Sequence, residues 1–375
     1  MLITFNLKCH NPLIRSYLKN DIKKFRQLID DGININSNDG FENSLISFVV
    51  SNIAEISDED NNKFFDILME NNVLIEQIDG AGNLLYWSLL YENKYCFKKL
   101  IDSGIDINSH NYYISPENGG EPIIFYTIDV MDSYYLNLIL NKDLDINVRS
   151  RRLDDTILND FIKTHSILKD EENLKIFQRL IDLGADINDR GDSGMQAIHC
   201  IALSEKNCLF DILFNGKMNY EINSRDANGD TALMCAVKFD NFDGTDILIK
   251  KGAFINVHNS NGKSPLHFSI MNDNDRIFDL LLKNDAVALT VDKNDCNILH
   301  NIIQTNWKNE EKYNKYYEKI IKKQPNLLFS KNKDGKTPID LLDKIKTNNP
   351  KKEFFENIAK KLNNKKTNDN KGISL

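Results

Sequence analysis

Two short Gly-Lys-Ser/Thr runs resemble the end of a phosphate-binding loop, in which backbone N–H groups and a lysine hold the phosphates of a nucleotide. They are Gly262-Lys263-Ser264 and Gly335-Lys336-Thr337. That loop requires a glycine five residues before its second glycine, and Val257 and Ser330 occupy those two places. The spacing therefore excludes a nucleotide-binding loop at both runs.

Metal ligation and nucleophilic catalysis also lack their usual motifs. The chain contains no His-Glu-x-x-His zinc motif and no Gly-x-Ser-x-Gly nucleophile motif. Its six cysteines lie at unrelated spacings, mostly on apolar helix faces, which favours reduced core thiols over disulfides or a metal site. They are Cys9, Cys96, Cys200, Cys208, Cys235 and Cys296. We expect neither a metal nor any other cofactor.

The elements that position these residues are repeated along the chain. A turn that leads into a first helix recurs ten times, and the residues in one fixed place of it are Asn11, Ser44, Asn83, Glu121, Thr156, Gln196, Thr231, Ser264, Asn297 and Thr337. Successive steps are 33, 39, 38, 35, 40, 35, 33, 33 and 40 residues. Such a period indicates stacked helical units, because a single unit cannot bury its own apolar face.

The repeated segment resembles the ankyrin repeat, whose pattern is roughly D-x-x-G-x-T-P-L-H, two helices, then L-L-x-x-G-A-D-I-N. Ser264-Pro265-Leu266-His267 and Thr337-Pro338-Ile339-Asp340 come closest to its tetrapeptide. The resemblance implies an all-α solenoid of about ten helix-pair units, joined by short β-hairpin turns. It also implies that His199, His267 and His300 bond to backbone between neighbouring units and do not bind a metal.

The repeats predict one continuous solenoid over residues 1–362. We expect 1–42 to be the N-terminal cap unit, 43–336 the internal units and 337–362 the C-terminal cap unit. Residues 363–375 are polar, and we expect a disordered tail there.

Three units carry seven extra residues between their two helices, near 51–61, 163–171 and 304–312. Two helical turns take about seven residues, so longer helices and an added loop both fit. A further insertion, 111–120, lies within a hairpin.

Composition and charge limit the location and the partner. The chain has 375 residues, 41% of them hydrophobic, and a formal net charge of −8. No apolar run is long enough to span a bilayer, and residues 1–10 lack the apolar core of a signal peptide. We expect a cytoplasmic protein, in the producing cell or in a host cell that it enters. The negative charge also opposes binding to nucleic acid.

A mostly basic line along the hairpin tips is the main candidate for recognition. Equivalent positions of stacked units form a line along one edge, and arginine suits carboxylates because of its planar fork. The candidate partner-binding residues are Arg149, Arg151, Arg152, Arg190, Arg225, His258, Lys293 and Lys331 on hairpins, Lys238 and Met271 on first helices, and Tyr112 and Tyr113 in the hairpin insertion. The alternative is ordinary solvated surface, which Asp226, Asp292 and Asp334 would neutralise.

The function that the resemblance implies is binding of another protein. We expect a monomeric, non-catalytic scaffold whose hairpin tips and first helices contact a partner with an acidic patch, with no small-molecule substrate. Its role would be that of an adaptor, an inhibitor or neutraliser resembling an immunity protein, or a host-directed effector. The alternative is an enzyme or modifier whose activity lies in the long inter-helix insertions.

Overall fold

The computed structural model describes most of the repeated region. The described residues are 11–37, 44–75, 83–108, 110–111, 120–130, 132–151, 153–164, 171–204, 206–216, 219–287, 291–304, 310–342, 357–358 and 360. The chain divides into two compact units, Met1–Asp192 and Ser193–Leu375, and each is described by itself.

Within its described residues, the first unit contains five helix pairs and one short hairpin. The pairs are α2 (Pro12–Leu18) with α3 (Ile22–Asp30), α4 (Leu45–Val50) with α5 (Asp58–Glu70), α6 (Leu84–Leu90) with α7 (Lys94–Asp102), α8 (Ile123–Asp129) with α9 (Ser133–Ile139), and α10 (Ile157–Thr164) with α11 (Glu171–Asp182). Between the third and fourth pairs, β1 (His110–Asn111) and β2 (Glu121–Pro122) are antiparallel.

The second unit continues the same order with four helix pairs and one further first helix. The pairs are α12 (Ala197–Ala202) with α13 (Cys208–Asn215), α14 (Ala232–Lys238) with α15 (Phe242–Lys250), α16 (Pro265–Met271) with α17 (Asp275–Lys283), and α18 (Ile298–Gln304) with α19 (Glu310–Lys323), and α20 (Pro338–Leu342) follows them. Two short 3-10 helices, η2 (Asp192–Gly194) and η3 (Pro325–Phe329), precede α12 and follow α19. The described part of the chain is therefore almost entirely helical, as the repeats predict.

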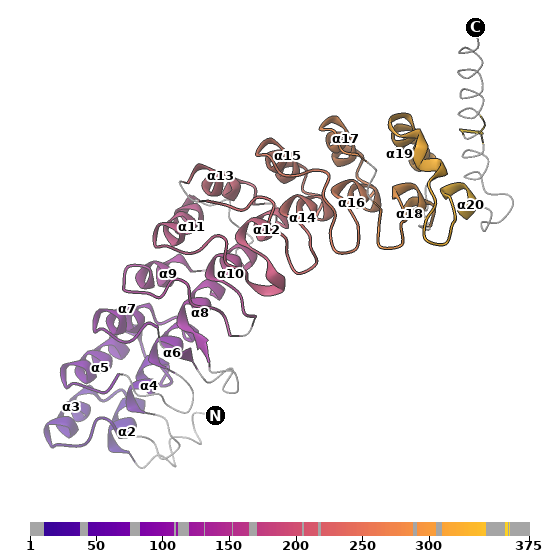
Figure 1. Ribbon diagram of the computed structural model, residues 1–375. Helices are drawn as coiled ribbons and strands as arrows, with labels where there is room; N and C mark the ends of the chain where they lie inside the picture. Colours follow the sequence, from indigo (N-terminus) through magenta and orange to yellow (C-terminus); the bar gives the residue numbers. More distant parts are fainter. Residues whose placement is uncertain are drawn as a thin grey trace, which may run out of the picture. The chain divides into compact units, whose positions relative to one another are not determined.

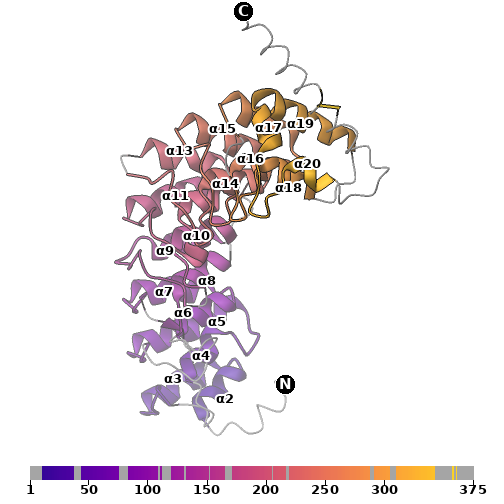
Figure 2. The same cartoon turned by 45° about the vertical axis from the view of Figure 1, so that its right-hand side comes forward.

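Within each unit, first helices pack on first helices and second helices on second helices. Figure 1 shows the two resulting rows, and Figure 2 shows them again after a turn of 45°. The turns that join one helix pair to the next extend beyond the row of first helices (Figure 1). Within a unit, a surface along the hairpins and first helices is thus separate from the row of second helices.

The first helices begin where the repeated place in the turn predicts. Asn11, Asn83 and Thr231 are N-caps whose side chains accept hydrogen bonds from backbone N–H groups of the first turn. Those N–H groups lack partners within the helix, so a capping side chain stabilises the helix start. Thr156 acts in the same way, because its hydroxyl accepts the N–H of Asn159 at 3.2 Å.

The fourth first helix begins one residue later than predicted. Its N-cap is Pro122, not Glu121. Buried hydroxyls confirm the shift, because Ser88 lies five residues after the cap of α6 and Thr127 lies five residues after Pro122. Both hydroxyls donate to the carbonyl three residues earlier. Glu121 instead lies buried, and its carboxylate accepts the N–H of Arg151 at 2.9 Å.

Six second helices, α3, α5, α7, α11, α15 and α17, end in a left-handed residue at the place where the sequence pattern has its glycine. Gly252 has a φ of 92°, and the next residue, Ala253, donates its N–H to Leu248 across the helix end. Glycine adopts this conformation without the cost that a Cβ would add. Asn72 and Asp285 occupy the same place with φ values of 58° and 61°. The left-handed helix end therefore occurs at the repeat position even where another residue replaces the glycine.

Longer helices account for much of the extra sequence in three units. The helices α5, α11 and α19 have 13, 12 and 14 residues, whereas α3, α7, α15 and α17 have nine each. Residues 165–170 and 305–309, between the helices of two of these units, lie outside the described residues. Tyr316 and Tyr317 on α19 are buried, Tyr316 against the ring of Phe278 on the preceding second helix. Burial is therefore the role of these two tyrosines, which the sequence alone does not distinguish from a contact surface.

A ladder of asparagines links successive repeats. Asn147 accepts the N–H of Asp186 at 3.0 Å and donates to the carbonyl of Gly184 at 3.1 Å. Asn256 makes the equivalent pair of bonds to the turn after α17. These amides therefore bond to the next repeat and are not confined to their own hairpin. No helix in the described part of the chain is long and apolar enough to cross a membrane.

Candidate partner-binding surface

The hairpin tips of the second unit are held in shape by their own backbone and by carboxylate or amide side chains. Asp226 donates its N–H to the carbonyl of Asp230 at 2.9 Å. One oxygen of the Asp226 carboxylate accepts the N–H groups of Asn228 and Asp230, each at 2.8 Å. Asp292 makes the same kind of turn, with Asn294 and Cys296 as donors. These two acids therefore organise the turns, as well as offsetting nearby positive charge.

Neighbouring hairpins are also joined to one another. Ala227 donates to the carbonyl of Ser193 at 2.9 Å, and Ser260 donates to Asn228 at 3.1 Å. Lys333 makes a similar bond to Asn294 at 3.0 Å. Backbone bonds between turns limit their motion, so the side chains on the tips are held in a fixed order.

Two arginines of the candidate line bridge one hairpin to the next. Arg225 donates to the carbonyl of Gly229 in its own turn at 3.0 Å and to that of His258 at 2.6 Å. His258 occupies the tip position of the next repeat. Arg149 likewise donates to the carbonyl of Arg190 at 2.5 Å. Both guanidinium groups therefore stabilise the stacking of hairpins, a role that the sequence analysis does not assign to them.

Arg149 is also neutralised by two carboxylates. Its guanidinium lies 2.8 Å from Asp154 and 2.8 Å from Asp189. The hydrogen bond with Arg149 lowers the pKa of Asp154, and the same bond raises the pKa of Arg149. With its charge shared in this way, Arg149 is a poorer anchor for an acidic partner than the sequence predicts.

The remaining hairpin candidates differ in exposure and description. Arg151, Arg190, His258, Lys293 and Lys331 are all exposed. Arg152, Tyr112 and Tyr113 lie outside the described residues. The exposed cations are thus distributed over both units, and within the second unit they lie on successive hairpins.

The two first-helix candidates, Lys238 and Met271, occupy equivalent places and are both exposed. Lys238 pairs with the buried carboxylate of Asp230, and its ammonium lies 4.6 Å from the centre of the Phe268 ring. Asp230 also accepts a hydrogen bond from Asn259 at 2.8 Å. Lys238 is thus tied to its own repeat, whereas Met271 presents 47% of its surface to solvent.

The three repeated histidines make the backbone contacts that the resemblance implies, with one exception. The Nε2 atom of His199 lies 3.1 Å from the carbonyl of Ser224, and that of His300 lies 3.0 Å from the carbonyl of Lys336. Each of these carbonyls belongs to the next hairpin. His267 is 3% exposed, and its Nε2 atom has no hydrogen-bond partner among the described residues.

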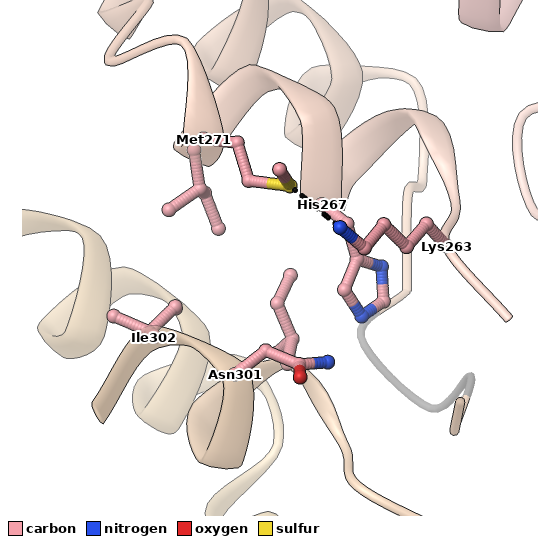
Figure 3. A pocket seen from close by; sticks show the side chains of 7 residues that line it. Lys263, His267, Met271, Asn301 and Ile302 are labelled. Carbon is pink, nitrogen blue, oxygen red and sulfur yellow. Dashed lines mark hydrogen bonds between the residues drawn. The ribbon is translucent and has the colours of Figure 1, made fainter. Parts of the chain in front are cut away.

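The Nε2 atom of His267 lies beside a pocket of about 110 Å³ between α16 and α18. Figure 3 shows Met271 and His267 from α16 opposite Asn301 and Ile302 from α18, with Lys263 above the imidazole. Ile270 and Ile298 complete the lining. Of the lining residues, the sequence analysis names only Met271 as a candidate for binding. The others come from two successive repeats.

No group of three or more His, Cys, Asp or Glu residues that could hold a metal ion occurs in the described residues. The described cysteines are all free thiols, and four of the five are buried.

Comparison with known proteins supports the repeat assignment. Residues 165–259 match the family model described as ankyrin repeats (3 copies). This segment of the chain consists of ankyrin repeats. Among solved structures, it is similar to the ankyrin repeat domain of Bcl-3, described as a unique member of the IkappaB protein family, with 16% identity over 68% of this chain and 92% of that chain and a TM-score of 0.42. A search of curated proteins finds no match.

Ankyrin repeats are scaffolds for protein–protein interaction, and the fold is typically not enzymatic. In this chain the family match covers the repeats around α11 to α15, where the turn and helix-end residues follow the family pattern closely. The outer repeats keep the helices and the caps with altered residues. The fold of an ankyrin repeat survives this drift because volume and patterning matter more than residue identity.

The hydrogen bonds of Arg225 to two hairpins are expected to stabilise the second unit. Arg225→Ala is expected to lower the free energy of unfolding of the second unit by about 1 kcal/mol, because two hydrogen bonds from a charged donor are lost at an exposed site. His258→Ala on the next hairpin is the control, and a change within about 0.5 kcal/mol is expected there. Urea unfolding followed by circular dichroism measures both, and equal effects would contradict a stacking role for Arg225.

Proposed function

We propose that this ankyrin repeat protein is a non-catalytic scaffold that binds another protein through its hairpin tips and first helices. The observation that carries the proposal is the ordered row of hairpins in the second unit. There, backbone bonds fix the turns, while Lys293 and Lys331 remain exposed. A rigid array of exposed side chains favours binding, because little conformational entropy is lost on association.

The charge of the exposed tips supports a partner with an acidic patch. In the described part of the chain, the ammonium groups of Lys293 and Lys331 form no ion pair, in contrast to Arg149. These two lysines are therefore the better candidates for long-range attraction of a carboxylate-rich surface. His258 belongs to the same proposed surface of the second unit, and Arg190 belongs to a corresponding proposed surface of the first unit.

The biological role that we propose is that of an adaptor, an inhibitor or neutraliser, or a host-directed effector, acting as a cytoplasmic monomer. Each role requires a rigid surface that covers part of another protein, and none requires a reactive group. One continuous solenoid over 1–362, with capping units at both ends and a polar tail at 363–375, is part of the same proposal.

Charge reversal on the hairpins tests this function. The partner is first captured on the immobilised full-length protein and identified by mass spectrometry. Lys293→Glu combined with Lys331→Glu is then expected to slow association about tenfold at low salt and less at high salt, because exposed charges act at long range and are screened. Binding rates measured by surface plasmon resonance at two salt concentrations give the result.

The matched control reverses two charges on second helices. Lys283→Glu combined with Lys322→Glu makes the same change in net charge on α17 and α19, away from the hairpins. We expect association close to that of the wild-type chain. Equal slowing in both double variants would show that net charge alone matters, and a wild-type chain that retains no protein would overturn the proposed function.

A further inference from the structure

The pocket between α16 and α18 has the shape and lining of a site for an aliphatic side chain. Ile270 and Met271 from one repeat face Ile298 and Ile302 from the next. The pocket has a volume of about 110 Å³. A cavity that holds a single water molecule measures about 10–15 Å³ on the same scale. The pocket therefore has room for a group of several heavy atoms, and its walls are mostly hydrocarbon.

His267, which lines this pocket, has a buried Nε2 donor without a partner in the described part of the chain. The Nδ1 atom of His267 accepts the N–H of Ser264 at 3.1 Å and lies 2.8 Å from the Ser264 hydroxyl. With Nδ1 used as an acceptor, the hydrogen of the neutral ring lies on Nε2. Leaving a buried donor unpaired costs about 1–3 kcal/mol, so an acceptor that enters the pocket removes this cost.

The imidazole is neutral over the physiological range, which fixes its role as a donor. Burial, which has the largest effect, and the positive charge of Lys263 together lower the pKa of His267 to about 4, against an opposing effect of Asp292. The group is thus a single N–H donor and not a cation. Any attraction for an anion at this place must come from a second residue.

Lys263 is that second residue. Its ammonium lies 3.4 Å from the sulfur of Met271, a weak acceptor. In the described part of the chain, no carboxylate forms an ion pair with it. A cation and a neutral donor thus both line a pocket whose other lining residues are three isoleucines, Met271 and Asn301 (Figure 3).

The equivalent positions in neighbouring repeats are already satisfied. His199 and His300 bond to carbonyls of the next hairpin. Lys238, which corresponds to Met271, pairs with Asp230, which corresponds to Lys263. At α16 the carboxylate is replaced by a lysine and the lysine by a methionine. That exchange leaves the cation beside a weak acceptor and places an apolar side chain at the pocket.

We propose that this pocket binds a short segment of a partner protein, in which an aliphatic side chain fills the pocket and a neighbouring Asp or Glu carboxylate accepts hydrogen bonds from His267 Nε2 and Lys263. The inference rests on the proposed function and names the chemistry that one part of its surface recognises. It places an anchoring contact on the first helices, apart from the hairpin cations.

A display library of random nine-residue peptides, selected on the full-length chain, tests this site. We expect the selected peptides to share a Leu, Ile or Met beside an Asp or Glu. Met271→Trp fills the pocket from an exposed position, and Lys263→Glu repels the carboxylate. Each is expected to weaken binding of the selected peptides about tenfold, as measured by fluorescence polarisation, because each removes a central anchor.

Two control variants make equivalent changes elsewhere. Leu90→Trp alters the corresponding exposed position of α6, and Lys283→Glu reverses a charge on α17. Both are expected to bind the peptides within about twofold of wild type, since neither residue lines the pocket. With ¹³C-labelled methionine, the methyl resonance of Met271 is expected to shift when peptide binds.

The outcomes separate this inference from the proposed function. If no selected peptide loses affinity on Met271→Trp, the pocket is not a docking site, while capture of a partner through the hairpins still supports the proposed function. Peptides that lack an acidic residue and tolerate Lys263→Glu would overturn the role of the carboxylate. A wild-type chain that captures neither peptides nor a partner protein overturns both.

Discussion

Gly262→Ala is expected to lower the free energy of unfolding of the second unit by about 3 kcal/mol. Gly262 lies in the hairpin before α16 with a φ of 78°. A Cβ there would lie 2.3 Å from the Cα of Asp292 and 2.9 Å from the carbonyl oxygen of Val291. Both atoms belong to the backbone of the next hairpin, so no side-chain rotation relieves the overlap.

The following hairpin provides a matched control. Gly335 occupies the same place in its turn with a φ of 70°, but no atom of the described chain lies within 4 Å of the position that its Cβ would take. Gly335→Ala therefore carries only the cost of the left-handed conformation, about 1 kcal/mol. Urea unfolding of both variants, followed by circular dichroism, measures the difference. Equal losses would show that close approach of neighbouring hairpins does not contribute.

Acid is expected to destabilise the second unit as the pH falls from 6.5 towards 4. His267 has a pKa of about 4 in the folded chain, mainly because burial disfavours the charged ring, and an ordinary value of 6.5 when unfolded. Between these values the unfolded chain binds more protons than the folded chain, so stability declines as pH falls. One pKa unit corresponds to about 1.4 kcal/mol, which limits the loss to about 3 kcal/mol.

His267→Gln removes this titration and keeps a polar side chain beside Ser264. The free energy of unfolding, measured by urea titration at several pH values, is expected to depend less on pH in the variant than in the wild type. Burial also lowers the pKa of His300, so part of the dependence is expected to remain. Identical curves for the variant and the wild type would contradict the assignment to His267. The imidazole resonances of His267 in NMR spectra give its pKa directly.

Helix starts and ends were predictable from the sequence because they depend on local chemistry. A side chain such as Thr231 accepts N–H groups within its own first turn, and a left-handed residue such as Gly252 closes its own helix. The same local logic failed by one residue at Pro122, where an extended proline, not a polar side chain, precedes the helix. The sequence does not distinguish longer second helices from an added loop, because seven extra residues fit either structure.

The roles of exposed residues were harder to predict, since they depend on what the next repeat places nearby. Arg225 and Lys293 are both basic residues on hairpins. Arg225 donates a hydrogen bond to the next hairpin, whereas Lys293 is exposed and makes no such bridge in the described residues. The pocket beside His267 was not predicted either. It exists only because Ile298 and Ile302 of the next repeat lie opposite Met271.

By itself, the sequence determined the repeat period, the helix pairs and the ankyrin resemblance, since each of these follows from patterns within about 33 residues. Only the tertiary structure decided which side chains are used between repeats and which are left exposed. The physical reason is that partners such as Arg225 and His258, or Lys263 and Ile302, lie 33 to 39 residues apart in the chain. Stacking brings such partners together, and the pattern of a single repeat does not record their contacts.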